Sequence, residues 1–295
     1  MTQQEQDTPR GLALAITAYV LWGFLPLYMK LITHIPAIEI VAHRVIWSIP
    51  VAGAVLLILR RTKDLRDAIR NPRMLLMACV TAALISVNWG IYIYAIATDR
   101  TADGALGYYI NPLFSMFLAA VLLGEKPSRL QMVSILIAAA AVVVLFVASP
   151  ASPWIPIGLT FSWGFYAYFK KSLPIGPNQG FLLEVLILAV PAGAYLIYLG
   201  ATGTGTFLSN SSDTWILLAA GVITAVPLMI YANGAKLIRL STAGILQYIA
   251  PSIIFGIAVF LFEEELDQSR LIAFPMIWTA LVIYSISMVR QMRRA

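Results

Sequence analysis

The sequence predicts an all-α integral membrane protein of ten transmembrane helices, arranged as two inverted five-helix repeats around a central cavity. Composition and an internal duplication lead to this prediction. Hydrophobic residues make up 60% of the 295 residues and charged residues only 12%, whereas soluble domains are about half apolar and about a quarter charged. The apolar residues also gather in runs long enough to cross a membrane.

The duplication appears at two nearly equal offsets. At 139 positions (248 − 109), the recurring residues are Arg100, Tyr109, Ile110, Pro112 and Glu125, found again as Arg239, Tyr248, Ile249, Pro251 and Glu264. At 141 positions (163 − 22), they are Trp22, Gly23, Phe24, Lys30, Pro36 and Pro50, found again as Trp163, Gly164, Phe165, Lys171, Pro177 and Pro191. We therefore expect two copies of one unit, at residues 1–149 and 150–295. In membrane proteins such duplication is typical of transporters that bind substrate between the repeats.

The spans follow from the length of the apolar runs. A helix that crosses the hydrocarbon core, about 30 Å thick, needs about 20 mainly apolar residues. Ten stretches meet this requirement, at residues 11–31, 37–59, 74–98, 103–123, 130–148, 154–171, 179–199, 214–236, 242–262 and 270–289. The connections are short and rich in Pro and Gly, which leaves no room for a soluble domain.

Lys and Arg in the short connections predict the orientation. With the N-terminus inside the cell, the inside segments carry 16 of the 20 Lys and Arg residues. The opposite side keeps Lys30, Arg100 and Arg270, while Arg44 lies within a span. Because cytoplasmic loops are enriched in basic residues, we expect a multi-pass protein of the inner (plasma) membrane with both termini cytoplasmic. No basic stripe with interleaved aromatic residues suggests a nucleic-acid partner.

The two halves are expected to cross the membrane in opposite directions. Each half holds five spans, an odd number, so the second half enters upside down. The connections agree, because Gly-Glu-Lys-Pro-Ser-Arg at 124–129 corresponds to Glu-Glu-Glu-Leu-Asp-Gln at 263–268. The basic residues of the inside connection are thus absent from its outside counterpart. Inverted repeats provide the two related conformations of alternating access.

Several motifs resemble the EamA branch of the drug/metabolite transporter superfamily. They are Trp-Gly at 22–23 and 163–164, Tyr-Ile-Asn-Pro at 109–112 and Gly-Glu at 124–125. Within that branch the RarD group is indicated by Ala-His-Arg-Val-Ile-Trp-Ser at 42–48, Asn-Trp at 88–89, Leu-Gly-Tyr-Tyr at 106–109, Leu-Ser-Thr at 240–242 and Gln-Tyr-Ile at 247–249. The resemblance implies a basket whose spans 1–4 and 6–9 line a central cavity. Spans 5 and 10 would be peripheral and serve in homodimer contacts, and members of the branch include exporters of amino acids and other small metabolites.

Ionisable residues within spans are costly and are therefore functional candidates. His43 lies one helical turn after Glu39, so their side chains can touch. Glu184 stands at the repeat-equivalent position of His43 (184 − 141 = 43). We take His43 and Glu184 as candidate substrate-binding groups, since an imidazole and a carboxylate can hold the two charges of a zwitterion or carry a proton. Alternatively, Glu39 and His43 form a structural pair and Arg44 extends to the outer headgroups.

Two prolines are candidate hinges. Pro112 in the fourth span and Pro251 in the ninth each remove a backbone hydrogen bond, which frees the carbonyls of Tyr108 and Gln247. Such breaks can form a gate or present backbone to a ligand. A kink required only for helix packing is the alternative.

The remaining candidate substrate-binding residues are aromatic or amide side chains within the spans. They are Trp22, Asn88, Trp89, Tyr92, Tyr109, Trp163, Asn233 and Tyr248. The aromatic residues lie away from the headgroup belt where membrane Trp and Tyr concentrate, and buried amides need partners. Trp22 and Trp163 are the strongest candidates for the cavity wall, because they lie near the midplane and are related by the repeat. Each of the others is equally compatible with helix packing.

Nothing in the sequence indicates catalysis, a metal site or a cofactor. The chain holds a single cysteine, Cys79, and two histidines, so neither a disulfide framework nor a cysteine metal cluster is available. The signatures of zinc proteases, serine hydrolases and phosphate-binding loops are missing. An enzyme is therefore not predicted, and ATP is not expected to be the energy source of this chain.

The sequence favours a secondary transporter that exports amino acids or similar small amphipathic metabolites. Aromatic, amide and few charged groups suit a cargo that is uncharged or zwitterionic. Export of cationic drugs is an alternative that ranks lower, because residues 11–33 contain no Asp or Glu. A sugar-phosphate carrier is disfavoured, because it would need paired basic residues within the membrane and only Arg44 is available. A membrane scaffold or a lipid-handling protein is the alternative from another class.

Overall fold

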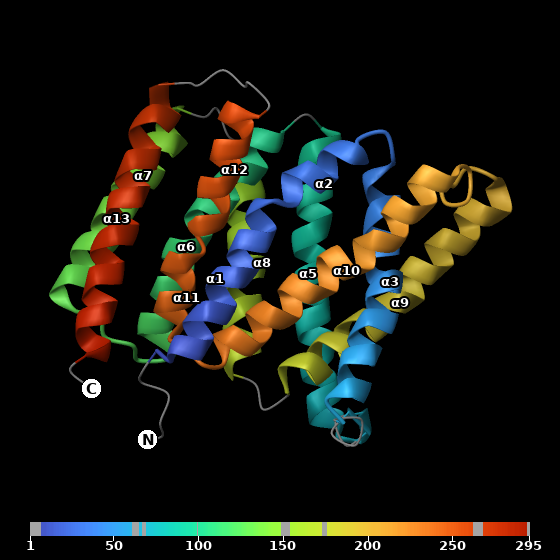
Figure 1. The fold of residues 1–295 in the computed structure, drawn as a ribbon, viewed down its shortest axis with the longest axis horizontal. Helices are drawn as coiled ribbons and strands as arrows, with labels where there is room; N and C mark the ends of the chain where they lie inside the picture. The colour runs from blue at the N-terminus through green and yellow to red at the C-terminus, as the bar shows by residue number, and fades with distance from the viewer. Residues whose placement is uncertain are drawn as a thin grey trace.

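The computed structural model describes residues 7–60, 65–66, 69–98, 100–148, 154–172, 176–261 and 268–293. Within these residues every regular element is a helix, which confirms the prediction of an all-α membrane protein. The helices are α1 (Pro9–Gly23), α2 (Leu25–Leu31), α3 (Ala37–Ile58), α5 (Pro72–Ala97), α6 (Thr101–Leu122), α7 (Arg129–Ala148), α8 (Trp154–Ser172), α9 (Pro177–Thr202), α10 (Ser211–Ala235), α11 (Leu240–Leu246), α12 (Ile249–Phe260) and α13 (Gln268–Met292). We call the end of the bundle where α1 begins and α13 ends the N-terminal face, and the opposite end the far face (Figure 1).

Nine helical segments of the described chain are long and apolar enough to cross a membrane. Two of them combine a pair of helices, α1 with α2 and α11 with α12. The remaining predicted span, the sixth at residues 154–171, is α8, which packs against α5 and α6. Its 19 residues extend about 28 Å at about 1.5 Å per residue. Lys170 and Lys171 in its last turn make it less apolar than its neighbours.

Two of the predicted continuous spans, the first and the ninth, are broken in the structure. Phe24 separates α1 from α2, and Pro26 in the first turn of α2 has no backbone N–H with which to continue the hydrogen bonds of α1. The second break lies between α11 and α12, at Gln247 and Tyr248, within one turn before Pro251. There the carbonyl of Gln247 accepts a hydrogen bond at 3.3 Å from the backbone N–H of Ala250, three residues later. The α-helical bond would come from residue 251, which is proline and has no N–H to donate.

Small residues allow the helices that surround the site to approach closely. At Gly221 of α10 a Cβ atom would lie 2.2 Å from the backbone of Trp47 in α3. At Gly234 of α10 it would lie 3.0 Å from the backbone nitrogen of Ala15 in α1. Helices in membranes associate through such close contacts, because lipid provides no hydrophobic force to bring them together.

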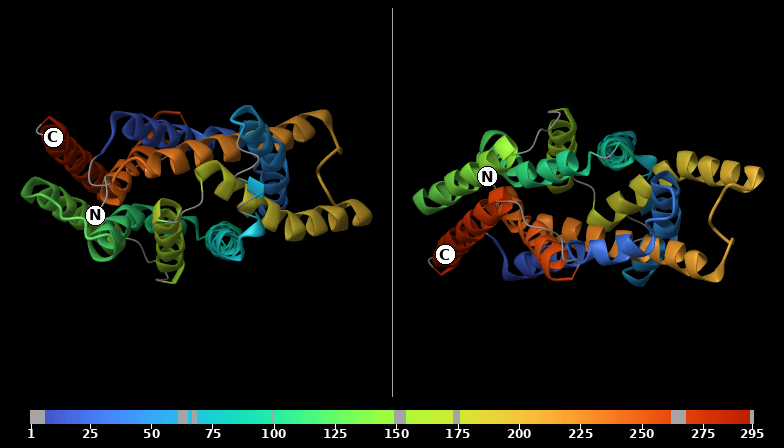
Figure 2. Two further views of the ribbon diagram at one scale, coloured as in Figure 1. Left: turned by 90° about the horizontal axis from the view of Figure 1, so that it is seen from below. Right: turned by 90° about the horizontal axis from the view of Figure 1, so that it is seen from above.

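The helices form an elongated bundle. α7 and α13 pack along each other at one edge, and α9 and α10 reach the opposite edge (Figures 1 and 2). Between these edges α1, α3, α5, α6 and α8 surround the middle of the molecule. α11 packs against α6 near the N-terminal face, whereas α12 packs against α1 toward the far face.

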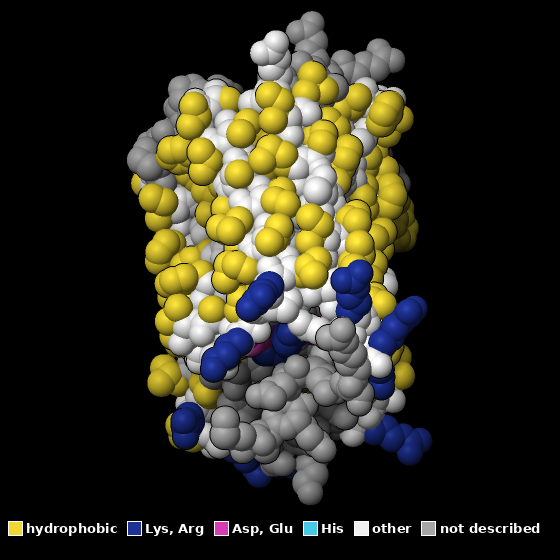
Figure 3. Space-filling model, turned by 90° about the vertical axis from the view of Figure 1, so that its left-hand side faces the viewer, with side chains coloured by type: hydrophobic (Ala, Val, Ile, Leu, Met, Phe, Trp, Pro, Cys, Tyr) yellow, Lys and Arg dark blue, Asp and Glu magenta, His cyan; other side chains and the backbone are white. Residues whose placement is uncertain are grey.

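The surface that includes α7 and α13 has the character expected of a membrane protein. Hydrophobic side chains cover most of its height, and Lys and Arg gather at the end that holds the N-terminal face (Figure 3). A hydrophobic band of this kind faces lipid, and basic side chains at one end are typical of the cytoplasmic side.

Candidate functional site

Aromatic side chains from α1, α8 and α10 form a cluster at mid-height of the bundle. Trp22 meets Trp163 edge to face, with ring centres 5.6 Å apart, and both rings lie near Tyr231, at 5.5 and 5.8 Å. Tyr19 and Tyr166 extend the cluster toward the N-terminal face. The structure therefore brings together Trp22 and Trp163, the two candidates related by the repeat.

Arg44 of α3 lies on the far-face side of this aromatic cluster. Its Nε donates to Thr224 Oγ1 of α10 at 2.8 Å, and its guanidinium carbon lies 5.0 Å from the ring centre of Trp89 in α5. One turn further along α5, Tyr92 packs edge to face against Tyr108 of α6, with ring centres 5.7 Å apart. Trp89 and Tyr92, both predicted site residues, thus lie near the same cation.

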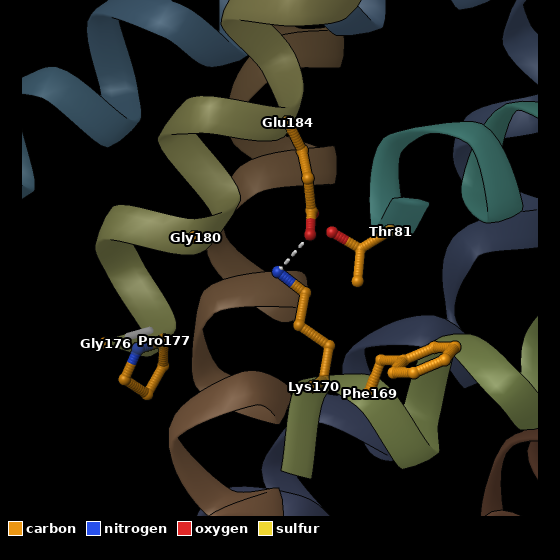
Figure 4. A pocket seen from close by; sticks show the side chains of 7 residues that line it. All are labelled: Thr81, Phe169, Lys170, Gly176, Pro177, Gly180 and Glu184. Atoms are coloured by element: carbon orange, nitrogen blue, oxygen red, sulfur yellow. Dashed lines mark ion pairs between the residues drawn. The ribbon is translucent and has the colours of Figure 1, made fainter. Parts of the chain in front are cut away.

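A buried ion pair lies on the opposite side of the aromatic cluster. Lys170 Nζ of α8 lies 2.7 Å from Glu184 Oε1 of α9, and both side chains are almost fully buried (Figure 4). The hydroxyl of Tyr166 donates to Glu184 Oε2 at 3.2 Å. Thr81 of α5 faces the pair across a cavity of about 20 Å³, which is room for about one water molecule. Glu184 is therefore neutralised within the protein.

Two carboxylates close the N-terminal face by binding the start of α11. Asp7 accepts hydrogen bonds from the backbone and guanidinium of Arg239 and from the hydroxyl of Thr242. Glu125, which follows α6, accepts from two backbone N–H groups at the start of α11 and from the hydroxyl of Ser241. Burial opposes the charge of Arg239, but its bonds to Asp7 raise the pKa of this guanidinium. The segment before α1 and the end of α6 are thus tied to one helix end, where negative charge is favourable.

His43 lies apart from these groups, beneath the connection between α9 and α10. Its Nδ1 accepts from Trp47 Nε1 at 3.1 Å, and its ring centre is 4.8 Å from that of Phe207. Glu39 Oε1 lies 3.9 Å from His43 Nε2 and accepts from the backbone N–H groups of Thr206 and Phe207. Glu39 and His43 therefore hold this connection in place, and a role of His43 in substrate binding stays a prediction.

The two predicted amides join neighbouring helices. Asn88 of α5 donates to the carbonyl of Leu159 at 3.1 Å and to Ser162 Oγ at 3.0 Å, both in α8. Asn233 of α10 donates to Asn178 Oδ1 of α9 at 2.7 Å. These bonds supply the partners that buried amides need. Participation of either amide in substrate binding stays a prediction.

Tyr109 and Tyr248, which the repeat also relates, lie away from the aromatic cluster. Tyr109 of α6 packs edge to face against Phe274 of α13, with ring centres 5.7 Å apart. Tyr248 is fully buried between α11 and α12, and its hydroxyl donates to the carbonyl of Tyr109 at 3.1 Å. The pair connects α6 to the break in the ninth span.

The two hinge candidates differ in their surroundings. Pro112 lies inside α6, which continues through it as one helix. Pro251 lies in the first turn of α12, directly after the break. Only one copy of the repeated proline therefore accompanies an interrupted helix in this conformation, and a hinge role for either stays a prediction.

Four residues of the site, Arg44, Tyr166, Lys170 and Tyr231, lie outside the predicted substrate-binding set. The sequence places Arg44 within a span, as a functional candidate or a residue that extends to the headgroups, and it assigns Lys170 only to the orientation. Tyr166 and Lys170 follow Trp163 at i+3 and i+7, which places all three on one face of a helix. Tyr231 lies 139 positions after Tyr92 (231 − 92). The offset of the repeat therefore relates it to a predicted site residue.

A bundle of membrane-spanning helices that encloses an aromatic cluster between charged groups has the architecture of a membrane carrier for small molecules. The EamA-like transporter family matches residues 9–147. Protein RarD of Streptomyces exfoliatus is 39% identical over 292 residues, covering 99% of this chain and 93% of its own. Protein RarD of Escherichia coli is 35% identical, covering 98% of each chain.

A solved crystal structure shows the same fold. It aligns with a TM-score of 0.73 at 19% sequence identity and covers 95% of this chain and 98% of its own. The chain belongs to the RarD-like EamA transporters of the drug/metabolite transporter superfamily. It is therefore a multi-pass membrane transporter, as the sequence motifs predicted.

Proposed function

We propose that this protein is a secondary transporter that exports amino acids or similar small amphipathic metabolites across the bacterial inner membrane by alternating access. The observation that supports it best is the aromatic cluster of Trp22, Trp163 and Tyr231, with Arg44 on one side and the Lys170–Glu184 pair on the other. A small amphipathic ligand has an apolar part that suits aromatic rings and charges that need polar groups nearby.

The two faces of the bundle define the path of export, whose net direction follows the substrate's own gradient. Basic side chains gather at the N-terminal face (Figure 3), which we assign to the cytoplasm. The bonds of Asp7 and Glu125 close that face in this conformation. In the opposite conformation, the start of α11 would separate from these carboxylates and admit substrate from the cytoplasm.

The charges of the site argue against a cationic drug as cargo. Such a cargo needs an available carboxylate, and Glu184 is already paired with Lys170 at 2.7 Å. A cation would have to displace the Lys170 ammonium from a buried position, which is costly when no replacement charge is present. A neutral solute requires no such exchange, and a zwitterion carries its own carboxylate beside its ammonium.

Counterflow in proteoliposomes tests the proposal. Vesicles loaded with one unlabelled amino acid are diluted into the labelled compound, for each of the twenty amino acids. We expect transient accumulation for a subset with apolar side chains. Trp163→Ala should raise the half-saturation concentration about twofold to tenfold, because an aromatic contact contributes about 0.5–1.5 kcal/mol. Trp215→Ala is the matched control, since that side chain is 70% exposed.

Other outcomes distinguish the alternatives. Flux of lipophilic cations without flux of amino acids would support a drug exporter. No solute-dependent flux in the full panel, with the protein correctly folded, would support a scaffold. Normal kinetics of Trp163→Ala would mean that the aromatic cluster is packing rather than a binding surface.

We further propose that flux runs down the substrate's own gradient. A proton-coupled cycle requires a group whose proton affinity differs between the two conformations, and the candidates are His43 and Glu184. Under our proposal, an imposed pH gradient does not drive wild-type accumulation. Gradient-driven uphill export that is lost selectively in His43→Gln or Glu184→Gln, with exchange retained, would contradict it.

A further inference from the structure

Arg44 is a cation held at a defined position within a membrane span. It lies seven residues after the far-face end of α3 at Ala37, about 10 Å along the helix at about 1.5 Å per residue. Thr224 accepts from Nε at 2.8 Å on one side, and the Trp89 ring supports the guanidinium at 5.0 Å on another. The hydrogen bond uses Nε, and Thr224 is not bonded to either terminal nitrogen of the guanidinium.

Arg44 has no carboxylate partner among the described residues. Each acidic side chain that the structure describes is bound elsewhere: Asp7 to Arg239, Glu39 to Thr206 and Phe207, Glu125 to the start of α11, Glu184 to Lys170 and Asp213 to His34. A guanidinium at hydrocarbon depth is expensive unless an anion or water compensates it. Its two contacts orient this one, and neither Thr224 nor Trp89 carries a negative charge.

The surroundings of Arg44 favour an organic anion. Tyr28, Tyr92 and Tyr108 all lie within electrostatic range of the guanidinium. These phenols and the Trp89 ring offer hydrogen-bond donors and aromatic faces. A guanidinium binds a carboxylate through two parallel hydrogen bonds, and a doubly charged phosphate would call for further basic groups.

We infer that Arg44 binds the carboxylate of the transported substrate, and that the cargo is therefore a small carboxylate with an apolar part. This inference rests on the proposed function and specifies its substrate class. The carboxylate lies against Arg44, Tyr92 and Tyr108, and the apolar part extends toward Trp22 and Trp163. Arg44 is then a specificity residue, because a ligand that lacks the carboxylate leaves the guanidinium without a partner.

Calorimetric titration of the purified full-length protein in detergent tests the inference without requiring transport. The probes are phenylacetate, phenylacetamide and phenyl phosphate, which share a ring and differ in charge and acid group. The variants are Arg44→Gln, Arg44→Lys and the control Lys30→Gln, which removes an exposed positive charge on the same side of the molecule. Counterflow of phenylalanine and of phenylalaninamide is measured on the same variants.

We expect the wild type to bind phenylacetate about tenfold to a hundredfold more tightly than phenylacetamide, and Arg44→Gln to lose that preference. Arg44→Lys should retain part of it, because an ammonium cannot make the paired contact. Lys30→Gln should keep the wild-type ratio. If Arg44→Gln does not fold, the ratio in Arg44→Lys decides, and an unchanged ratio there overturns the inference.

The remaining outcomes separate this inference from the proposed function. Binding of phenylacetate that depends on Arg44, without counterflow of any amino acid, supports the carboxylate site and rejects amino acids as cargo. A wild-type preference for phenyl phosphate or phenylacetamide over phenylacetate overturns the inference. Equal acid-to-amide ratios in wild type and Arg44→Gln also overturn it, and would mean that Arg44 serves the headgroups or helix packing.

Discussion

The ion pair of Lys170 and Glu184 lies among almost fully buried side chains, with Tyr166 as the additional hydrogen-bond donor. Removing one charge of such a pair leaves the other uncompensated, whereas replacing both by apolar groups of similar volume is close to neutral. The pair is therefore more important as a unit than either residue alone.

We predict that Glu184→Gln lowers the stability of the protein by about 3–5 kcal/mol and that the double variant Lys170→Met/Glu184→Met recovers most of it. Thermal unfolding in detergent, followed by circular dichroism, gives the comparison. Lys126→Met, in an exposed connection, should behave as wild type. The single variants Lys170→Met and Glu184→Met complete the cycle, and a double variant whose loss of stability equals the sum of theirs would contradict a coupled pair.

Lys236 follows α10 at the N-terminal face and donates to the carbonyl of Lys171 at 2.9 Å. Burial and the charges of Lys171 and Lys170 lower the pKa of Lys236 to about 8, from an ordinary value of 10.5. The folded protein therefore binds this proton more weakly than the unfolded chain does. The resulting penalty on folding is complete below about pH 8 and fades as the pH rises toward 10.5.

We predict that this group makes the melting temperature increase with pH above about pH 8 and that Lys236→Met reduces the increase. The measurement is the difference between wild type and variant in thermal scans at successive pH values, since other groups also titrate in that range. Lys126→Met is the control and should keep the wild-type slope. Identical slopes for wild type and Lys236→Met would show that the ammonium of Lys236 is not destabilised in the folded state.

Single residues could be selected from the sequence only where the repeat or the helical period relates them. Trp22 and Trp163 could be selected in this way, and they meet. Arg44 and Thr224 are 180 positions apart and share no pattern. Their hydrogen bond depends on how α3 and α10 are rotated about their axes, which the hydrophobic length of a span does not determine.

At the scale of helices, the contact between α3 and α10 holds Arg44 and Thr224 in register. The backbones approach at Gly221, and Ser48 Oγ donates to the carbonyl of Gly221 at 3.3 Å. A side chain at this position would separate the two helices, and the hydrogen bond of Arg44 would lengthen.

We predict that Gly221→Ala destabilises the protein by about 1–3 kcal/mol, because a Cβ atom there would lie 2.2 Å from the Trp47 backbone. Gly90→Ala in α5 is the matched control, since its Cβ would meet nothing within 4 Å. Thermal unfolding of both variants measures the difference in their stability. Equal stability of the two variants would show that α3 and α10 adjust without cost.

The breaks in the first and ninth spans are also properties of individual helices and their neighbours. Pro251 was a predicted hinge and Pro26 was not, yet both accompany a break, whereas Pro112, the repeat equivalent of Pro251, lies in an unbroken helix. Proline removes a donor everywhere, but whether the helix bends or ends depends on the neighbours that pack against it. The ninth span is interrupted where Tyr248 is buried and bonded to α6.

For the whole molecule, the ends of the bundle differ. The N-terminal face is closed by Asp7 and Glu125, and basic side chains gather there (Figure 3). The far face carries the start of α3 and the connection that Glu39 fastens. Orientation in the membrane decides whether the closed face is cytoplasmic, as the proposed export direction requires.

We predict that Ser211→Cys is labelled from outside by a membrane-impermeant maleimide in right-side-out vesicles, and that Lys126→Cys is labelled only after permeabilisation. Both residues are exposed, at the far face and the N-terminal face respectively, and the background carries Cys79→Ala. Labelling of both from outside, or the reverse pattern, would contradict the proposed orientation and the inverted arrangement of the two halves.

The sequence by itself determined the class of the protein and the family, because membrane-length hydrophobicity and family motifs are local properties of the chain. It also related Trp22 to Trp163 through the repeat. Only the tertiary structure decided that Lys170 neutralises Glu184, that His43 serves a connection and that Arg44 has no carboxylate partner among the described residues. Those facts depend on which faces of distant helices meet, and in a membrane that is set by close packing rather than by the hydrophobic pattern.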